Sequence, residues 1–160
     1  MGRPAHDASE QVKRPRSLGP FPSSWLKQQG AADDPLTMSD VMVIDADDDS
    51  IAMLGWYLSL HGHEVRRAVS VVDAFDQIAV QAPDAMIIDL DLPGMSGHEF
   101  LSSLRHQGLA ADAQVVMLGA AADARAAIRS WELGVDDHIV RPVQLERIAD
   151  ALARQPVGIG

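Results

Sequence analysis

The stretch PDAMIIDLDLPGMSG, residues 83–97, decides the fold. It contains a short, uninterrupted apolar run at residues 85–88, which is typical of a strand buried on both faces of a parallel sheet. Asp89 ends this run, and a proline–glycine pair a few residues later marks a tight turn. Because helical periodicity follows the turn, the stretch predicts a buried strand, a polar turn and a helix.

The same alternation of short apolar runs and helical periods continues on both sides of that stretch. Predicted strands cover residues 41–45, 64–68, 85–89, 114–118 and 138–140. Predicted helices cover residues 49–61, 71–81, 97–107, 122–133 and 143–154. Ser70 and Asp73 resemble a helix-start capping box, and Gly62, Gly108 and Gly134 mark helix ends. Five βα units predict an α/β fold, a doubly wound five-stranded parallel sheet with helices on both faces.

Acidic residues are concentrated in the predicted folded part. The chain of 160 residues has 13 Lys and Arg against 23 Asp and Glu, a formal net charge of −10. Residues 1–40 contain five charges of each sign, so residues 41–160 carry the whole net charge. A domain this negative repels nucleic acid backbones and anionic lipid. We therefore expect this domain to bind neither nucleic acid nor membrane, and to prefer cationic partners or a metal ion.

The sequence also indicates the compartment. It contains no cysteine, which excludes disulfides, thiolate zinc sites and cysteine nucleophiles, and which fits a reducing cytoplasm. No apolar run is long enough to span a bilayer, and the N-terminus lacks the pattern of a secretory signal. We expect a cytoplasmic protein.

The first 37 residues differ in composition from the rest of the chain. Five of the nine prolines fall within the first 35 residues, and no periodicity is sustained there. Residues 1–37 are therefore predicted to be a disordered N-terminal extension, either native or added ahead of a start at Met38. The folded domain is expected over residues 38–156, followed by a tail at 157–160. No output domain follows in this sequence, so docking by this domain and a longer parent protein both stay open.

Polar side chains gather where the predicted strands end. Asp45 ends the first strand, Asp89 ends the third, and Arg141 follows the fifth. Ligands of doubly wound sheets bind outside the carboxyl ends of the strands, so these groups are expected to face one another. No Gly-x-Ser-x-Gly or His-Glu-x-x-His motif accompanies them, and we expect no enzymatic activity. A small-molecule α/β enzyme is the outside alternative, which saturable turnover would reveal.

Residues 41–155 resemble the receiver domain of two-component response regulators. Residues 83–97 are similar to the family's phosphoacceptor strand and its following turn, and residues 132–137 with Arg141-Pro142 are similar to the approach to its last strand. The resemblance implies a flavodoxin-like receiver with strand order 2-1-3-4-5 and a cis Arg141–Pro142 bond. It also implies that Asp89 is the aspartate that becomes phosphorylated.

The same resemblance implies a metal ion and phosphoryl contacts around Asp89. A carboxylate that attacks a phosphoryl group needs cations to neutralise the oxygens, and Mg²⁺ suits clustered carboxylates and carbonyls. The implied Mg²⁺ ligands are Asp45, Asp89 and Asp91, with Asp47 as a further candidate. The implied phosphoryl-binding groups are Arg141 and Ala120.

Several positions depart from the family pattern. The second acid after the first strand, which normally touches the metal, is Ala46, so we expect weak Mg²⁺ binding. Gly119 replaces the hydroxyl residue that ends the fourth strand. Arg141 replaces the family's lysine, and its planar guanidinium is not equivalent to an ammonium group. His138 stands at the aromatic position of the fifth strand.

These departures favour an atypical, degenerate receiver that signals mainly by protein–protein contact. The alternative is a conventional receiver that a histidine kinase or phosphotransfer protein switches by phosphorylating Asp89. Output is expected through the fourth helix, fifth strand and fifth helix, toward a downstream effector protein or a second copy. Gly119, His138 and Trp131 lie in or beside this switch face. Because the chain has few aromatic residues, Trp131 is predicted to pack in the core despite its place on that helix.

Overall fold

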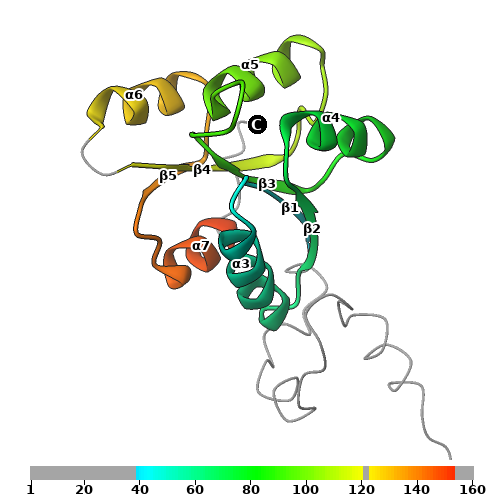
Figure 1. Cartoon of the computed structure of the whole chain (residues 1–160), viewed down its shortest axis with the longest axis vertical. Helices are drawn as coiled ribbons and strands as arrows, with labels where there is room; N and C mark the ends of the chain where they lie inside the picture. The colour runs from blue at the N-terminus through cyan, green and yellow to red at the C-terminus, as the bar shows by residue number, and fades with distance from the viewer. Residues whose placement is uncertain (1–38, 121–122, 154–160) are drawn as a thin grey trace, which may run out of the picture.

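The chain folds, in a computed structural model, into a sheet between two layers of helices (Figure 1). The structure describes residues 39–120 and 123–153, so the expected extension at 1–37 and the tail at 157–160 lie outside the described residues. The strands are β1 (Asp40–Ile44), β2 (Glu64–Ala68), β3 (Ala85–Asp89), β4 (Gln114–Gly119) and β5 (Asp137–Val140). Neighbouring strands pair in parallel in the order β2-β1-β3-β4-β5, which confirms the predicted fold class.

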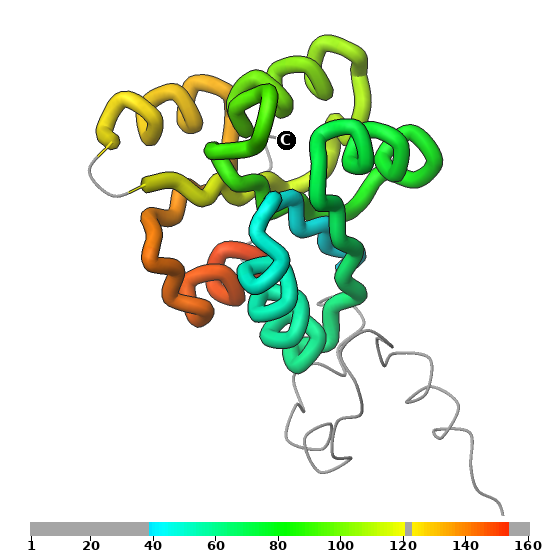
Figure 2. The backbone as a smooth tube through the Cα atoms, in the orientation of Figure 1, coloured from blue at the N-terminus to red at the C-terminus, as the bar shows by residue number. Residues whose placement is uncertain are grey.

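The described residues form five helices, of which the first four connect successive strands and the last follows β5. They are α3 (Asp48–Leu60), α4 (Val71–Val80), α5 (Gly97–His106), α6 (Ala124–Glu132) and α7 (Leu145–Ala153). Helices α3 and α7 cover one face of the sheet, and α4, α5 and α6 cover the other, as the path of the backbone in Figure 2 makes plain. The crossovers from β1 to β2 and from β2 to β3 lie on opposite faces, so β3 pairs with β1 on the side away from β2 and the carboxyl ends of β1 and β3 become neighbours.

The core consists of two apolar layers, one on each face of the sheet. All five residues of β3 are buried. Their side chains alternate, so Met86 and Ile88 pack under α4 and α5 while Ala85 and Ile87 pack against α3 and α7. This two-sided burial is the physical reason for the uninterrupted apolar run.

The helix boundaries follow the predicted punctuation. The Ser70 hydroxyl accepts a hydrogen bond from the Asp73 amide at 3.1 Å and caps α4. The Asp47 carboxylate caps α3 in the same way, accepting from the Asp49 amide at 3.1 Å. Gly62, Gly108 and Gly134 have φ values of 89°, 70° and 78°, a left-handed backbone that ends a helix at low cost in glycine.

Charged side chains mark β2, the strand at one edge of the sheet. Glu64, Arg66 and Arg67 account for three of its five residues. Arg66 donates to both carboxylate oxygens of Asp40, at 2.9 and 2.8 Å, and to the Gln81 carbonyl at 3.0 Å. These bonds fasten β2 to the start of β1 and to the end of α4.

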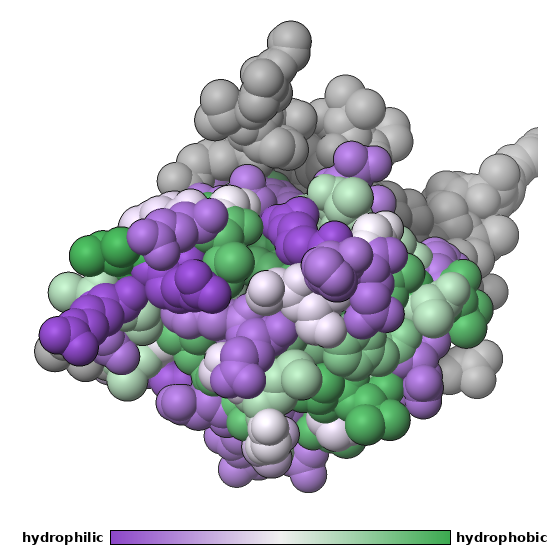
Figure 3. All heavy atoms as spheres, turned by 90° about the horizontal axis from the view of Figure 1, so that it is seen from above, coloured by the Kyte–Doolittle hydropathy of each residue, from purple (hydrophilic) through white to green (hydrophobic). Residues whose placement is uncertain are grey.

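The outer surface over α4, α5 and α6 mixes hydrophilic and hydrophobic residues (Figure 3). Among the described helices, none combines the length and the apolar character that crossing a bilayer requires.

Candidate functional site

Two buried carboxylates lie side by side at the carboxyl ends of β1 and β3. Asp45 directly follows β1 and is 1% exposed, and Asp89 is the last residue of β3 and is 8% exposed. Asp45 Oδ1 accepts a hydrogen bond from the Asp47 amide at 3.0 Å, and Asp89 Oδ1 accepts one from the Asp91 amide at 3.2 Å. The turns after both strands therefore hold the carboxylates in place through backbone amides.

Arg141, which follows β5, bridges these two carboxylates. Its Nη2 lies 3.0 Å from Asp45 Oδ2 and 3.3 Å from Asp89 Oδ1. Burial raises the pKa of Asp89, the Asp91 amide opposes that rise, the Asp45 charge adds to it, and Arg141 opposes it. Burial disfavours the charged guanidinium, but Asp89 and Asp45 outweigh it and raise the pKa of Arg141. The Arg141–Pro142 peptide bond is cis, as predicted.

Helix α5 begins directly against the backbone of Asp89. A Cβ atom added to Gly97 would lie 2.5 Å from the Asp89 carbonyl oxygen and 3.0 Å from the Leu90 Cα. The Gly97 amide also donates to the Leu90 carbonyl at 2.9 Å. A residue without a side chain is therefore required for this close approach.

The residues at this site do not fit the Mg²⁺ ion that the family resemblance implies. Within the described part of the chain, no cluster of three or more His, Cys, Asp or Glu side chains is arranged to hold a metal ion. Ala46 offers no metal ligand, and the Asp47 carboxylate accepts the hydrogen bond that caps α3. The Asp91 side chain is exposed, and only its amide contacts Asp89. The guanidinium of Arg141 supplies the positive charge between the two carboxylates instead.

Gly119 and His138 meet at the ends of β4 and β5. A Cβ atom at Gly119 would lie 2.9 Å from His138 Nε2 and 3.0 Å from His138 Cε1. The buried imidazole thus fills the space that a side chain at position 119 would need. Its Nε2 atom is buried and has no hydrogen-bond partner among the described residues. Ala120, the next residue of the chain, is exposed.

A hydrogen-bonded chain that the sequence did not indicate holds the His138 ring. His138 Nδ1 lies 2.8 Å from Ser130 Oγ, and the same hydroxyl lies 2.8 Å from His98 Nε2. Ser130 on α6 is fully buried, and His98 is at the start of α5. Burial is the main cause that lowers the pKa of both imidazoles. These hydrogen bonds therefore link α5 and α6 to β5 through imidazole rings that are neutral at ordinary pH.

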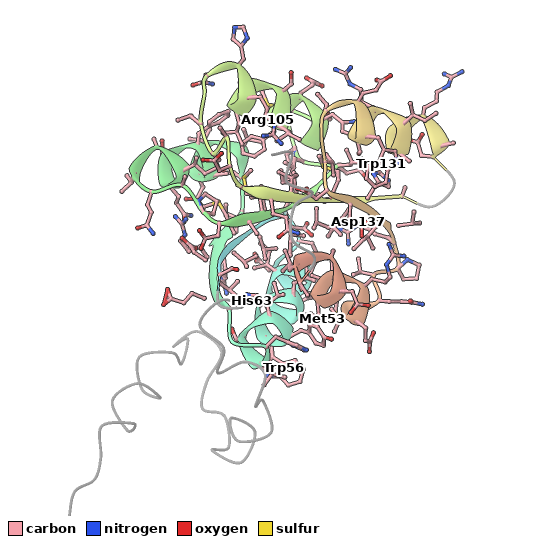
Figure 4. All side chains as sticks on the ribbon, turned by 180° about the vertical axis from the view of Figure 1, so that it is seen from behind. Met53, Trp56, His63, Arg105, Trp131 and Asp137 are labelled. Carbon is pink, nitrogen blue, oxygen red and sulfur yellow. The ribbon has the colours of Figure 1, made fainter. Side chains whose placement is uncertain are left out.

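Trp131 is on the surface, so its predicted burial is wrong. It lies on α6 and is 52% exposed (Figure 4). Successive residues of a helix point about 100° apart, and Ser130 takes the inward direction. Trp131 therefore turns away from the core, on the same helix as Ile128, which is 57% exposed.

Comparison with known proteins points to one family. A protein-family model described as "Response regulator receiver domain" matches residues 41–153. The transcriptional regulatory protein PrrA of Mycobacterium bovis is 31% identical over 113 residues, which make up 71% of this chain and 48% of PrrA. The transcriptional regulatory protein AfsQ1 of Streptomyces coelicolor is 32% identical over 117 residues, 73% of this chain and 50% of AfsQ1. The chain thus spans about half the length of these curated relatives.

Solved structures give the same result. The crystal structure of a proposed response regulator from Chloroflexus aurantiacus is similar to this chain with a TM-score of 0.64 and 36% identity. The similarity covers 72% of this chain and 98% of the other.

Proposed function

The chain belongs to the response regulator receiver family of two-component signal transduction, and from that premise we propose that it signals mainly through protein–protein contact, whether or not Asp89 is phosphorylated. The proposed role is non-enzymatic and cytoplasmic, with a downstream effector protein or a second copy as partner. The family supplies the setting, and the departures of this chain supply the reason for the atypical mode.

The observation that carries the proposal is the packing of His138 against Gly119. In the receivers that this chain resembles, a hydroxyl at the end of the fourth strand moves toward the phosphoryl group, and an aromatic ring turns into the vacated space. Here Gly119 has no side chain to move, and the His138 ring already fills that space. Ser130 holds the ring from its other side at 2.8 Å. A switch needs contacts that differ between its two states, and this pair offers none.

The proposed docking surface is the switch face formed by α6, β5 and α7. Ile128, Trp131 and Val140 are 57%, 52% and 44% exposed. Ile128 and Trp131 are three positions apart on α6 and therefore share one side of that helix. Exposed large apolar side chains of this kind are typical of protein interfaces, and tryptophan often dominates their binding energy. The net charge of −10 disfavours nucleic acid and anionic membranes as partners of this surface.

A second candidate function is a conventional phosphoswitch. The intact Asp89 favours it, because this carboxylate ends β3 next to Arg141 and its Oδ2 has no hydrogen-bond partner within the described residues. In that function a histidine kinase or phosphotransfer protein would phosphorylate Asp89. Arg141 and the Ala120 amide would then bind the phosphoryl oxygens.

Association measured in three states distinguishes the two functions. Partner affinity, or self-association by sedimentation, is compared for the wild type, for Asp89→Asn and for a sample treated with beryllofluoride and Mg²⁺. We expect changes below about threefold, or ~0.7 kcal/mol. A tenfold gain with beryllofluoride that disappears in Asp89→Asn would establish the phosphoswitch instead. Trp131→Ala serves as the surface control and should weaken association in all three states.

Phosphorylation itself needs a separate measurement. Intact mass after incubation with a small phosphodonor and Mg²⁺ reports whether Asp89 accepts a phosphoryl group at all, with Asp89→Asn as the blank. Saturable turnover of a small-molecule substrate would contradict the non-enzymatic role.

A further inference from the structure

The guanidinium of Arg141 occupies the space that a metal ion shared by Asp45 and Asp89 would need. One nitrogen atom, Nη2, contacts a carboxylate oxygen of each residue, at 3.0 and 3.3 Å. Mg²⁺ binds carboxylate oxygens at about 2.0–2.1 Å, so an ion bound to the same two oxygens would lie where Nη2 lies. The guanidinium and the ion therefore exclude each other.

The remaining oxygens of the pair do not offer an alternative set of ligands. Asp45 Oδ1 accepts a hydrogen bond from the Asp47 amide at 3.0 Å, and Asp89 Oδ1 is shared between Arg141 and the Asp91 amide. Only Oδ2 of Asp89 is left without a partner in the described part of the chain. A single carboxylate oxygen is a poor site for an ion that gives up its water reluctantly.

Burial makes the positive charge of Arg141 necessary. Asp45 and Asp89 are 1% and 8% exposed and lie at the carboxyl ends of neighbouring strands. Two adjacent buried carboxylates repel each other and need a cation between them. A divalent ion meets this need in a site built for metal, and here a side chain of the protein meets it.

We propose that Arg141 is a built-in cation that replaces the divalent metal at the ends of β1 and β3, and that its guanidinium competes with such a metal for Asp45 and Asp89. The folded wild-type chain is then insensitive to Mg²⁺ and Mn²⁺. Removing the guanidinium creates a metal site from carboxylates that are already in place. This inference concerns the cation only and does not depend on which partner the switch face binds.

The test is direct metal binding to the wild type and to Arg141→Ala. Mn²⁺ affinity is measured by electron paramagnetic resonance, and the midpoint of thermal unfolding is measured in EDTA and in excess Mg²⁺ at constant ionic strength. We expect Arg141→Ala to bind Mn²⁺ at least about tenfold more tightly than the wild type. It should unfold at a lower temperature in EDTA and regain stability in Mg²⁺, because a ligand of the folded state stabilises it.

Two controls locate the effect. Arg147→Ala removes another arginine that pairs with an aspartate, Asp137, at 3.5 Å, and it should gain no Mn²⁺ binding. Adding Asp89→Asn to Arg141→Ala should abolish the gain, because it removes one of the two charged ligands.

Three results would overturn the proposal. They are equal Mn²⁺ affinity in the wild type and Arg141→Ala, a Mg²⁺-dependent rise in the wild-type unfolding temperature, and paramagnetic broadening of the wild-type Asp89 and Asp91 amide signals by Mn²⁺. If Arg141→Ala does not fold, Arg141→Gln keeps much of the side-chain stem without the charge and takes its place. The wild-type measurements remain decisive even then.

Discussion

The two halves of the sheet's carboxyl edge are built differently. At β1 and β3, Asp45 and Asp89 stand where the receiver resemblance leads us to expect acidic residues, and backbone amides and one guanidinium hold them. At β4 and β5, Gly119 and His138 stand where the receiver resemblance leads us to expect a hydroxyl residue and an aromatic residue, and Ser130 holds the His138 ring. The halves meet where the Arg141 amide donates to the Gly119 carbonyl at 2.8 Å.

Under the proposed function, this difference means that receiving a phosphoryl group and transmitting its presence rest on separate sets of contacts. The acceptor half, at the ends of β1 and β3, depends on charge and on the close approach of α5. The switch half, at the ends of β4 and β5, depends on the His138 ring that fills the space beside Gly119 and on a neutral hydrogen-bonded chain. A substitution can therefore affect one half while leaving the other intact, and the following substitutions use this separation.

The largest expected effect is at the acceptor half, in Gly97→Ala. The new Cβ would lie 2.5 Å from the Asp89 carbonyl oxygen, a backbone atom that cannot move aside alone. We expect a loss of about 3 kcal/mol in the free energy of unfolding, measured by urea denaturation. Gly55→Ala is the matched control, because its Cβ would meet Val65 at an ordinary 3.6 Å within a helix. A loss in Gly55→Ala as large as that in Gly97→Ala would contradict the explanation.

The next effect is at the switch half, in Ser130→Ala. This change leaves His98 Nε2 and His138 Nδ1 without the hydroxyl that both contact at 2.8 Å. A buried ring nitrogen of His138 and a partly buried one of His98, both without a partner, should cost about 2 kcal/mol of unfolding free energy. Ser103→Ala removes a partly exposed hydroxyl that accepts from Gln107 at 3.2 Å, and its cost should stay below about 0.5 kcal/mol. Equal losses in the two variants would show that the hydrogen bonds of Ser130 with His98 and His138 add no more stability than the hydrogen bond of a partly exposed hydroxyl.

A smaller effect is expected from Ala46→Asp, which restores an acid at the acceptor half. A carboxylate at position 46 adds charge and a ligand beside Asp45, where the wild type has only a methyl group. We expect Ala46→Asp to raise Mg²⁺ affinity about tenfold, or ~1.4 kcal/mol, by chemical-shift titration in an Arg141→Ala background, where the competing guanidinium is absent. Unchanged affinity would mean that Ala46 is not a cause of weak metal binding.

The smallest effect is a pH dependence that originates at the switch half. Burial lowers the pKa of His98 and His138 in the folded state. Between that lowered pKa and the unfolded-state pKa of about 6.5, the unfolded state therefore binds more protons than the folded state. The stability that these two histidines contribute should therefore be fully present above the unfolded-state pKa and should fall as the pH drops toward the folded-state pKa. Denaturation at several pH values should show a shallower fall in His138→Phe and an unchanged one in the exposed His106→Gln.

Asp89 acts with the opposite sign and must be separated from the histidines. Its pKa is raised mainly by burial, so the stability it contributes is present at low pH and is lost as the pH rises through the folded-state pKa. Making the histidine comparison in an Asp89→Asn background removes this contribution. A fall in stability that does not respond to His138→Phe would assign the pH dependence elsewhere, with His63, whose pKa burial also lowers, as the next residue to test.

The fold could be predicted from the sequence because each buried strand of a parallel sheet must be apolar on both faces. The run at residues 85–88 has no other reason to exclude polar residues. The neighbourhood of Asp45, Asp89 and Arg141 could be predicted too, because parallel strands bring their carboxyl ends to one edge. The individual atomic contacts could not be predicted from the sequence, because the bridge through one nitrogen depends on the side-chain conformation of Arg141.

The histidine–serine chain lay beyond sequence reasoning. His98 is 32 positions from Ser130, and His138 is eight positions from it, on three different elements. Their contact depends on how α5 and α6 pack beside β5, and no local pattern encodes that packing. The helical phase of α6 could have helped, because Ser130 lies four residues after Ala126, which also packs toward the core. The same phase would have placed Trp131 outside.

The charged residues of β2 bear on aggregation. An edge strand exposes backbone groups that can pair with a strand of another molecule, and long flat apolar edges invite such pairing. Within residues 39–120 and 123–153, β2 pairs with β1 alone, and it carries Glu64, Arg66 and Arg67 on its short length. Arg66 is also pinned to Asp40, so its charge stays close to the strand. The sheet therefore discourages open-ended strand addition at this edge, and leaves association to the helical surfaces.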